Sequence, residues 1–163
     1  MRRILAMPLA CLALAVSACG FQLQGVSSFA PELASVYLAV PDPNSDLAVQ
    51  LRRSLAAAGA GLTHDATAGT ATLRIVDERY GRRVKSVSAQ NRPTEYEVFY
   101  VAQYEVQGKE GTLLAPQRVS RSRVFPYNER DILGKQQEEE MLREALARDI
   151  AGLITRQLAG LDP

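Results

Sequence analysis

The segment EYEVFYVAQYEVQ, residues 95–107, carries the clearest structural pattern in the chain. Its side chains alternate in character, as expected for a long β-strand with one packed face and one polar face. The polar face is mostly glutamate and glutamine, and its two apolar exceptions are Phe99 and Val101. The pattern favours a core position for the other face, although a row of tyrosines would also suit ligand stacking. That face carries Tyr96, Val98, Tyr100, Ala102, Tyr104 and Val106.

The segments on either side of this strand also have strand character. Residues 71–88 begin with ATLRIV and contain Gly81, where we expect a bend or a bulge. Residues 90–93 (QNRP) have the composition of a hairpin turn. Residues 112–125 form the next predicted strand, and Pro116 suggests that it lies at an edge of the sheet.

Two segments have the spacing of amphipathic helices. The first covers residues 46–58, where leucines recur every four residues after a serine that can cap the helix. The second covers residues 136–158, which show one apolar stripe and begin with the acidic run Glu138–Glu140. This acidic run is interpreted as a solvated first turn at the positive helix end rather than as a metal site.

The remaining segments complete the expected fold. Residues 35–40 (SVYLAV) predict a strand, whereas residues 62–69 are interpreted as a polar loop that carries the only histidine, His64. The resulting order is β-α-β-β-β-α, which predicts an α+β two-layer sandwich. Two helices would pack on one face of a roughly four-stranded, mostly antiparallel sheet, and the first β-α-β link makes a mixed sheet possible.

The N-terminal segment has the features of a lipoprotein signal. Arg2 and Arg3 precede an apolar run, and Val16-Ser17-Ala18-Cys19 has the form of a bacterial lipobox. We therefore expect residues 1–18 to be removed and Cys19 to carry the lipid. Gly20, where an aspartate would favour the inner membrane, favours the outer membrane. The expected domains are residues 19–30 as a lipidated tether and residues 31–163 as a single α+β domain.

Composition argues against several functions. Loss of Arg2 and Arg3 leaves fewer basic residues than the 18 acidic ones, so general nucleic-acid binding is not expected. Of the two cysteines, Cys11 leaves with the signal and Cys19 would be acylated, so no disulfide is expected. No phosphate-binding loop or catalytic motif is present. We expect no enzyme activity, no cofactor and no metal.

Basic residues gather in two blocks that contain no acidic residue. Arginine suits phosphate geometry, but charged side chains on exposed strands also prevent edge-to-edge pairing, and both interpretations stay open. Period two places Arg121 and Arg123 on one face. The first block holds Arg79, Arg82, Arg83, Lys85 and Arg92, and the second holds Arg118, Arg121 and Arg123.

Several motifs, in this order, resemble the LptE family of lipopolysaccharide-assembly lipoproteins. Residues 19–25 (CGFQLQG) are similar to the start of the family's mature chains, and residues 51–55 (LRRSL) are similar to its first helix. Residues 94–98 (TEYEV) resemble the opening of a family strand. Residues 121–125 and Lys135 before the last helix resemble the C-terminal part, so the match covers nearly the whole mature chain.

The resemblance implies a lipid-anchored protein of the outer membrane that sits one-to-one as a plug inside the LptD β-barrel. It also implies help with assembly of that barrel and binding of lipopolysaccharide during delivery to the outer leaflet. Lys135 matches a family lysine that contacts lipopolysaccharide, whereas Ala89 stands where the family has an arginine. The candidate lipopolysaccharide-binding residues are Lys135, Arg92, Arg82, Arg83, Lys85, Arg121 and Arg123. The alternative function is a regulatory periplasmic lipoprotein that activates a cell-envelope enzyme.

Overall fold

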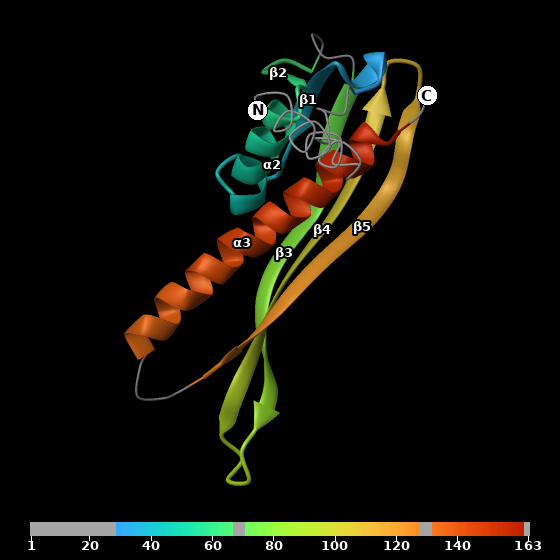
Figure 1. Ribbon diagram of the computed structural model, residues 1–163. Coiled ribbons are helices and arrows are strands. Elements are labelled where there is room, and N and C mark those ends of the chain that lie inside the picture. The colour runs from blue at the N-terminus through green and yellow to red at the C-terminus, as the bar shows by residue number, and fades with distance from the viewer. Residues whose placement is uncertain (1–28, 67–70, 128–131, 162–163) are drawn as a thin grey trace, which may run out of the picture.

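The computed structural model describes residues 29–66, 71–127 and 132–161. Within these ranges, two α-helices lie over one face of a five-stranded sheet, and the other face is uncovered (Figure 1). The elements are η1 (Pro31–Leu33), β1 (Ser35–Ala39), α2 (Asp46–Ala57), β2 (Gly61–Thr63), β3 (Ala71–Val87), β4 (Pro93–Gly108), β5 (Thr112–Pro126) and α3 (Ile132–Ala159).

The sheet is mixed, as the sequence allowed. Its order is β2-β1-β3-β4-β5, with β1 parallel to both β2 and β3 and the remaining pairs antiparallel. The predicted α+β sandwich is therefore confirmed, but with five strands instead of roughly four. The additional strand is β2, which occupies the start of the segment interpreted as a loop. Three residues are too few to show a period, so no pattern along the chain predicted this strand.

Helix α2 forms where its leucine spacing predicted. The Ser45 hydroxyl caps it by accepting a hydrogen bond from the Ala48 amide at 3.2 Å. Gly59 follows the helix with a φ of 91°, a conformation that glycine adopts without steric cost. The helix buries one face completely, and that face carries Leu47, Ala48, Leu51 and Leu55.

Strand β4 confirms the assignment of the tyrosine row to the core. Val98, Tyr100, Ala102, Tyr104 and Val106 are at most 3% exposed, and Tyr96 is half-buried. The buried hydroxyls keep polar partners, because Tyr100 donates to Glu78 at 2.9 Å and Tyr104 to Gln157. Burial, with Glu78 second, raises the pKa of Tyr100, so the ring stays neutral in the core.

Helix α3 begins at Ile132, earlier than the expected start at residue 136. Its apolar stripe of Leu146, Ile150, Ile154 and Leu158 is fully buried. The expectation that Glu138–Glu140 form a solvated first turn is wrong, because the helix already has a full turn before them. Glu139 instead reaches β3, where it binds Arg82 at 2.6 Å and accepts from the Tyr80 hydroxyl at 3.1 Å.

Gly81 is not a bulge. It pairs regularly with Phe99, and the irregularities of β3 lie between Ile75 and Asp77 and around Ser86. The glycine is instead covered by the Phe99 ring, since a Cβ at this position would lie 2.5 Å from the ring's Cζ. Glycine therefore permits the ring to lie flat on the uncovered face of the sheet.

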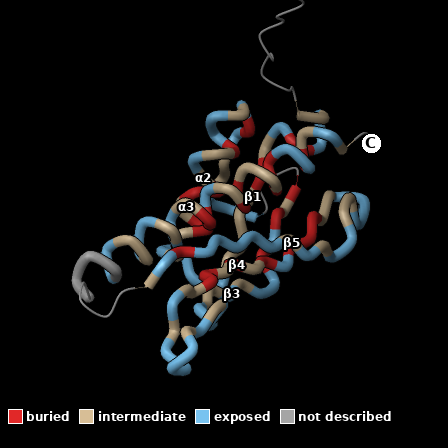
Figure 2. Tube along the Cα trace, turned by 60° about the horizontal axis from the view of Figure 1, so that its bottom comes forward, coloured by how far each residue is buried: buried red, intermediate tan, exposed pale blue. Residues whose placement is uncertain are grey.

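The long β3–β4 hairpin extends beyond the N-terminal end of α3 (Figure 1). Figure 2 shows the buried residues where the helices cover the sheet and exposed residues at the free end of this hairpin. The predicted turn at residues 90–93 closes it, with Asn91 at a φ of 58° and a hydrogen bond from the Ser88 amide to the Arg92 carbonyl at 2.8 Å.

Candidate functional site

Apart from Arg92, which lies in the hairpin turn, the two basic blocks lie on β3 and β5, which flank β4 on either side. The register decides which face of the sheet each basic residue occupies. Arg82 and Arg123 both align with Val98 of β4, so they lie on the helix-covered side. Arg83 aligns with Glu97 and therefore lies on the uncovered face, which we call the open face. The open face contains the residues of β4 with odd numbers from 97 to 105, and their partners on β3 and β5.

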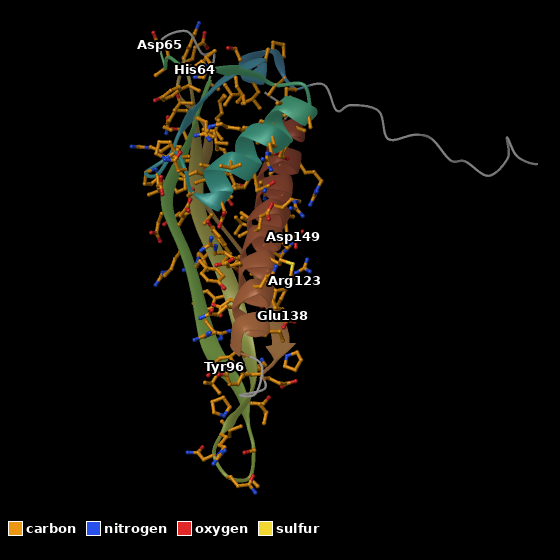
Figure 3. The ribbon with its side chains drawn as sticks, turned by 90° about the vertical axis from the view of Figure 1, so that its left-hand side faces the viewer. His64, Asp65, Tyr96, Arg123, Glu138 and Asp149 are labelled. Carbon is orange, nitrogen blue, oxygen red and sulfur yellow. The ribbon has the colours of Figure 1, made fainter. Side chains whose placement is uncertain are left out.

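Three of the candidate lipopolysaccharide-binding arginines are held in ion pairs. Arg82 binds Glu139 at 2.6 Å and Arg83 binds Glu97 at 2.6 Å. Arg123 binds Asp149 of α3 at 2.8 Å, and Figure 3 shows these two side chains side by side. These pairs join β3 and β5 to β4 or α3. They contribute to the fold and reduce the positive charge available to a ligand.

Glu97 is the most tightly held of these acids, being only 7% exposed. The hydrogen bond from Arg83 is the main cause that lowers the pKa of its carboxyl, and a hydrogen bond from Ser122 adds to the effect. The same bond raises the pKa of the Arg83 guanidinium. The Arg83 guanidinium also lies 5.6 Å from the centre of the Phe99 ring, within the range of a cation–π interaction.

A hollow of about 470 Å³ lies on the open face, beside this ion pair. Its floor contains Phe99 and Val101, the two apolar residues that interrupt the polar face of β4. Arginine and serine side chains of β3 and β5 surround that floor. They are Arg79, Arg83, Arg118, Arg121, Ser120 and Ser122.

The remaining candidates lie elsewhere. Lys85 is exposed near the free end of the β3–β4 hairpin, and Arg92 lies in its turn, where its amide donates to the Ser88 hydroxyl at 3.3 Å. Lys135 belongs to the first turn of α3, but its side chain is outside the described residues. Cys19 is also outside them. The structure therefore brings only Arg83 and Arg121 of the candidate set into one hollow.

Arg79 and Arg118 line the hollow although they were not among the candidates. Their blocks were visible in the sequence, but the antiparallel register was needed to place them on the same face. The serines and the apolar floor were missed as well. The one signal in the sequence was Phe99 and Val101, which break an otherwise polar alternation.

A second hollow of about 440 Å³ lies between β3 and α3, but its two arginines, Arg82 and Arg143, are held in ion pairs with Glu139 and Asp46. His64 and Asp65 lie at the end of the molecule opposite Tyr96 (Figure 3). Within the described ranges, no group of three or more histidine, cysteine or acidic side chains is arranged to hold a metal ion. Neither α2 nor α3, as described, has an apolar stretch long enough to cross a bilayer.

The protein is an α+β domain with one face of its sheet covered by helices, and the other face carries an arginine-lined hollow whose chemistry suits anionic groups. Comparison with known proteins shows which family the chain belongs to. The family model LptE, described as lipopolysaccharide-assembly, matches residues 33–158. The chain belongs to the LptE family, so it is a lipoprotein of lipopolysaccharide assembly and transport and not an enzyme.

Individual relatives agree with this assignment. The chain is 29% identical to the LPS-assembly lipoprotein LptE of Yersinia pestis (strain Pestoides F), over 96% of this chain and 75% of that protein. The solution structure of lipoprotein B from Nitrosomonas europaea matches with a TM-score of 0.72 and 26% identity, covering 86% of this chain and 90% of that one. The crystal structure of rare lipoprotein B from Shewanella oneidensis matches in fold with a TM-score of 0.67 at 21% identity, covering 77% of this chain and 93% of that one.

Proposed function

We propose that this protein is an outer-membrane lipoprotein, anchored through a lipid on Cys19, that binds the LptD β-barrel one-to-one as a plug inside its lumen. It helps to assemble that barrel and binds lipopolysaccharide during delivery to the outer leaflet. The observation that carries the proposal is the family match across the folded domain, residues 33–158. The lipobox that ends at Cys19 supplies the anchor.

The surface of the domain suits an enclosed position. Large outer-membrane barrels have a polar lumen, and the open face presents charged and polar side chains to any surrounding wall. Arg74 and Glu105, which pair at 2.5 Å, illustrate this surface. The open face is mostly polar, apart from apolar residues such as Phe99, Val101 and Val124, and a surface of this kind can contact a polar wall.

The proposal assigns lipopolysaccharide contact to the basic residues of the candidate set, among them Lys135 and Arg92. Arg82, Arg83 and Arg123 are expected to contribute less to lipopolysaccharide binding. Each of them is already paired with an acidic side chain of this protein. We therefore expect the paired arginines to act mainly through the fold. Lys85 and Arg121 stay within the proposed contact set.

The test is extraction of a tagged protein from membranes with detergent, followed by identification and quantification of what co-purifies. We expect a large β-barrel at equal stoichiometry, and we expect Cys19→Ser to lose its membrane attachment because several buried acyl chains supply it. A periplasmic enzyme as the only companion would reject the plug and favour the alternative, a regulatory lipoprotein. Membrane attachment of Cys19→Ser equal to that of the wild type would reject the anchor.

A further inference from the structure

The hollow on the open face occupies an interval between two cross-strand ion pairs. Arg74 and Glu105 pair at 2.5 Å on one side of it, and Arg83 and Glu97 pair at 2.6 Å on the other. At both positions an arginine of β3 is neutralised by the facing glutamate of β4. Between them β4 offers no acid, because its residues on this face are Phe99, Val101 and Gln103. On the flanking strands the interval contains Arg79, Arg118 and one acid, Asp77, so positive charge exceeds negative charge in this part of the face.

The arginines of this interval have no acidic partner among the described residues. Arg79 and Arg118 form no ion pair there, although Asp77 lies one position further along the same face. Arg121 donates to the carbonyl of its neighbour Ser120 at 3.1 Å. Each guanidinium has five N–H donors, so most of the donors around the hollow are available to a ligand.

The register places Arg79 and Arg118 on the open face, with Arg118 beside Gln103 of β4. Arg121 aligns with Tyr100, on the helix-covered side, and therefore lines the hollow from the edge of β5. Arg79 aligns with Val101 of β4, and Val101 aligns with Ser120 of β5. Neighbouring strands lie about 4.8 Å apart, so the backbones of Arg79 and Ser120 are separated by about 10 Å, with Val101 between them. Arginine side chains from both outer strands can therefore reach above Val101, while the Phe99 ring extends the apolar floor.

The positive surface continues round the edge of the sheet. Arg118 and Arg121 also line another hollow of about 380 Å³, together with Arg156 of α3. The two hollows share these two arginines, so a ligand that carries more than one anionic group finds donors on both sides of the β5 edge.

This chemistry fits a phosphorylated amphiphile. Guanidinium forks bind phosphate oxygens in bidentate fashion, and the apolar floor accepts the non-polar part of a ligand. Strand addition by an extended peptide would use the free edge of β5, but it pairs backbone groups and would leave the guanidiniums of the hollow without an anionic partner. We propose that the hollow binds phosphate groups of lipopolysaccharide through Arg79, Arg118 and Arg121. This assignment rests on the proposed function and adds a site distinct from Lys135 and from the hairpin turn.

The experiment measures the Kd of the detergent-purified protein for lipopolysaccharide and for the same lipopolysaccharide after enzymatic removal of its phosphates. The test variant is Arg79→Gln with Arg118→Gln. The matched control is Arg53→Gln with Arg148→Gln, which removes the same charge from exposed positions of the helix layer. We expect the test variant to bind lipopolysaccharide about tenfold or more weakly, as the loss of charge-assisted hydrogen bonds implies. The control variant should bind like the wild type.

Removal of phosphate should weaken binding by the wild type by a similar factor and change binding by the test variant little. Equal affinity of the wild type for both forms of the lipid would overturn the assignment without use of any variant. Equal affinity of the test and control variants would overturn it as well, as would no binding by the wild type. Co-extraction of the barrel is a separate measurement, so loss of this site and loss of the proposed function give different results.

Discussion

Replacement of Ile150 by alanine tests whether α3 closes the core of this domain. Ile150 is completely buried in the middle of the apolar stripe of α3. Large-to-small substitutions at such sites cost about 2–5 kcal/mol, from lost burial together with the cavity that remains. Domains of this kind have a free energy of unfolding of about 5–15 kcal/mol. We therefore expect Ile150→Ala to remove a large fraction of the stability.

The assay is urea denaturation of residues 19–163 with Cys19→Ser, so that no lipid is attached. Met141 provides the matched control, because it lies on the same helix but is 60% exposed. Met141→Ala should change the free energy of unfolding by no more than about 0.5 kcal/mol. A loss below about 1 kcal/mol for Ile150→Ala, or equal losses for both variants, would refute the packing of α3 against the sheet.

Three further predictions concern the helix cap Ser45, the ion-paired Glu97 and the proposed lipopolysaccharide contact Lys135. Ser45→Ala should lower the free energy of unfolding by about 1 kcal/mol in urea, because the cap of α2 is lost. Glu97→Gln should reduce the difference in Tm between pH 7 and pH 3. The pKa of the Glu97 carboxyl is lowered in the folded protein, so its ionised form stabilises the fold at pH values above the ordinary pKa of 4.5. This stabilisation is lost as the pH falls through the lowered pKa. A Tm difference equal to that of the wild type would contradict this. Lys135→Glu should weaken lipopolysaccharide binding with an unchanged Tm, whereas Lys109→Glu, at an exposed turn, should not; equal affinities would remove Lys135 from the site.

The strongest elements of the fold were predictable because they repeat a period over many residues. Residues 95–107 alternate over more than ten positions, and the structure buries the predicted face. Strand β2 has three residues and no measurable period. The start of α3 was placed too late, since Gly134 is a residue that usually marks a helix end, yet the helix continues through it.

The site was less predictable, because it depends on partners far apart in the sequence. The acid-free blocks showed that arginines cluster, but they did not show which arginines are neutralised from other elements. Arg82 pairs with Glu139 on another element, and Arg123 pairs with Asp149 in the same way. The arginines without such partners, Arg79 and Arg118, became distinguishable only when register and ion pairs were known together.

The position of α3 after all of the sheet strands has a consequence for folding during synthesis. The sheet strands are made first, and the tyrosine row of β4 then lacks α3, the helix that packs on it. Side chains such as Tyr104 and Val98, fully buried in the finished domain, face solvent until α3 emerges and docks. Exposed apolar surface of this kind favours aggregation and chaperone binding. The nascent chain is therefore expected to depend on chaperones until α3 (Ile132–Ala159) is available to dock.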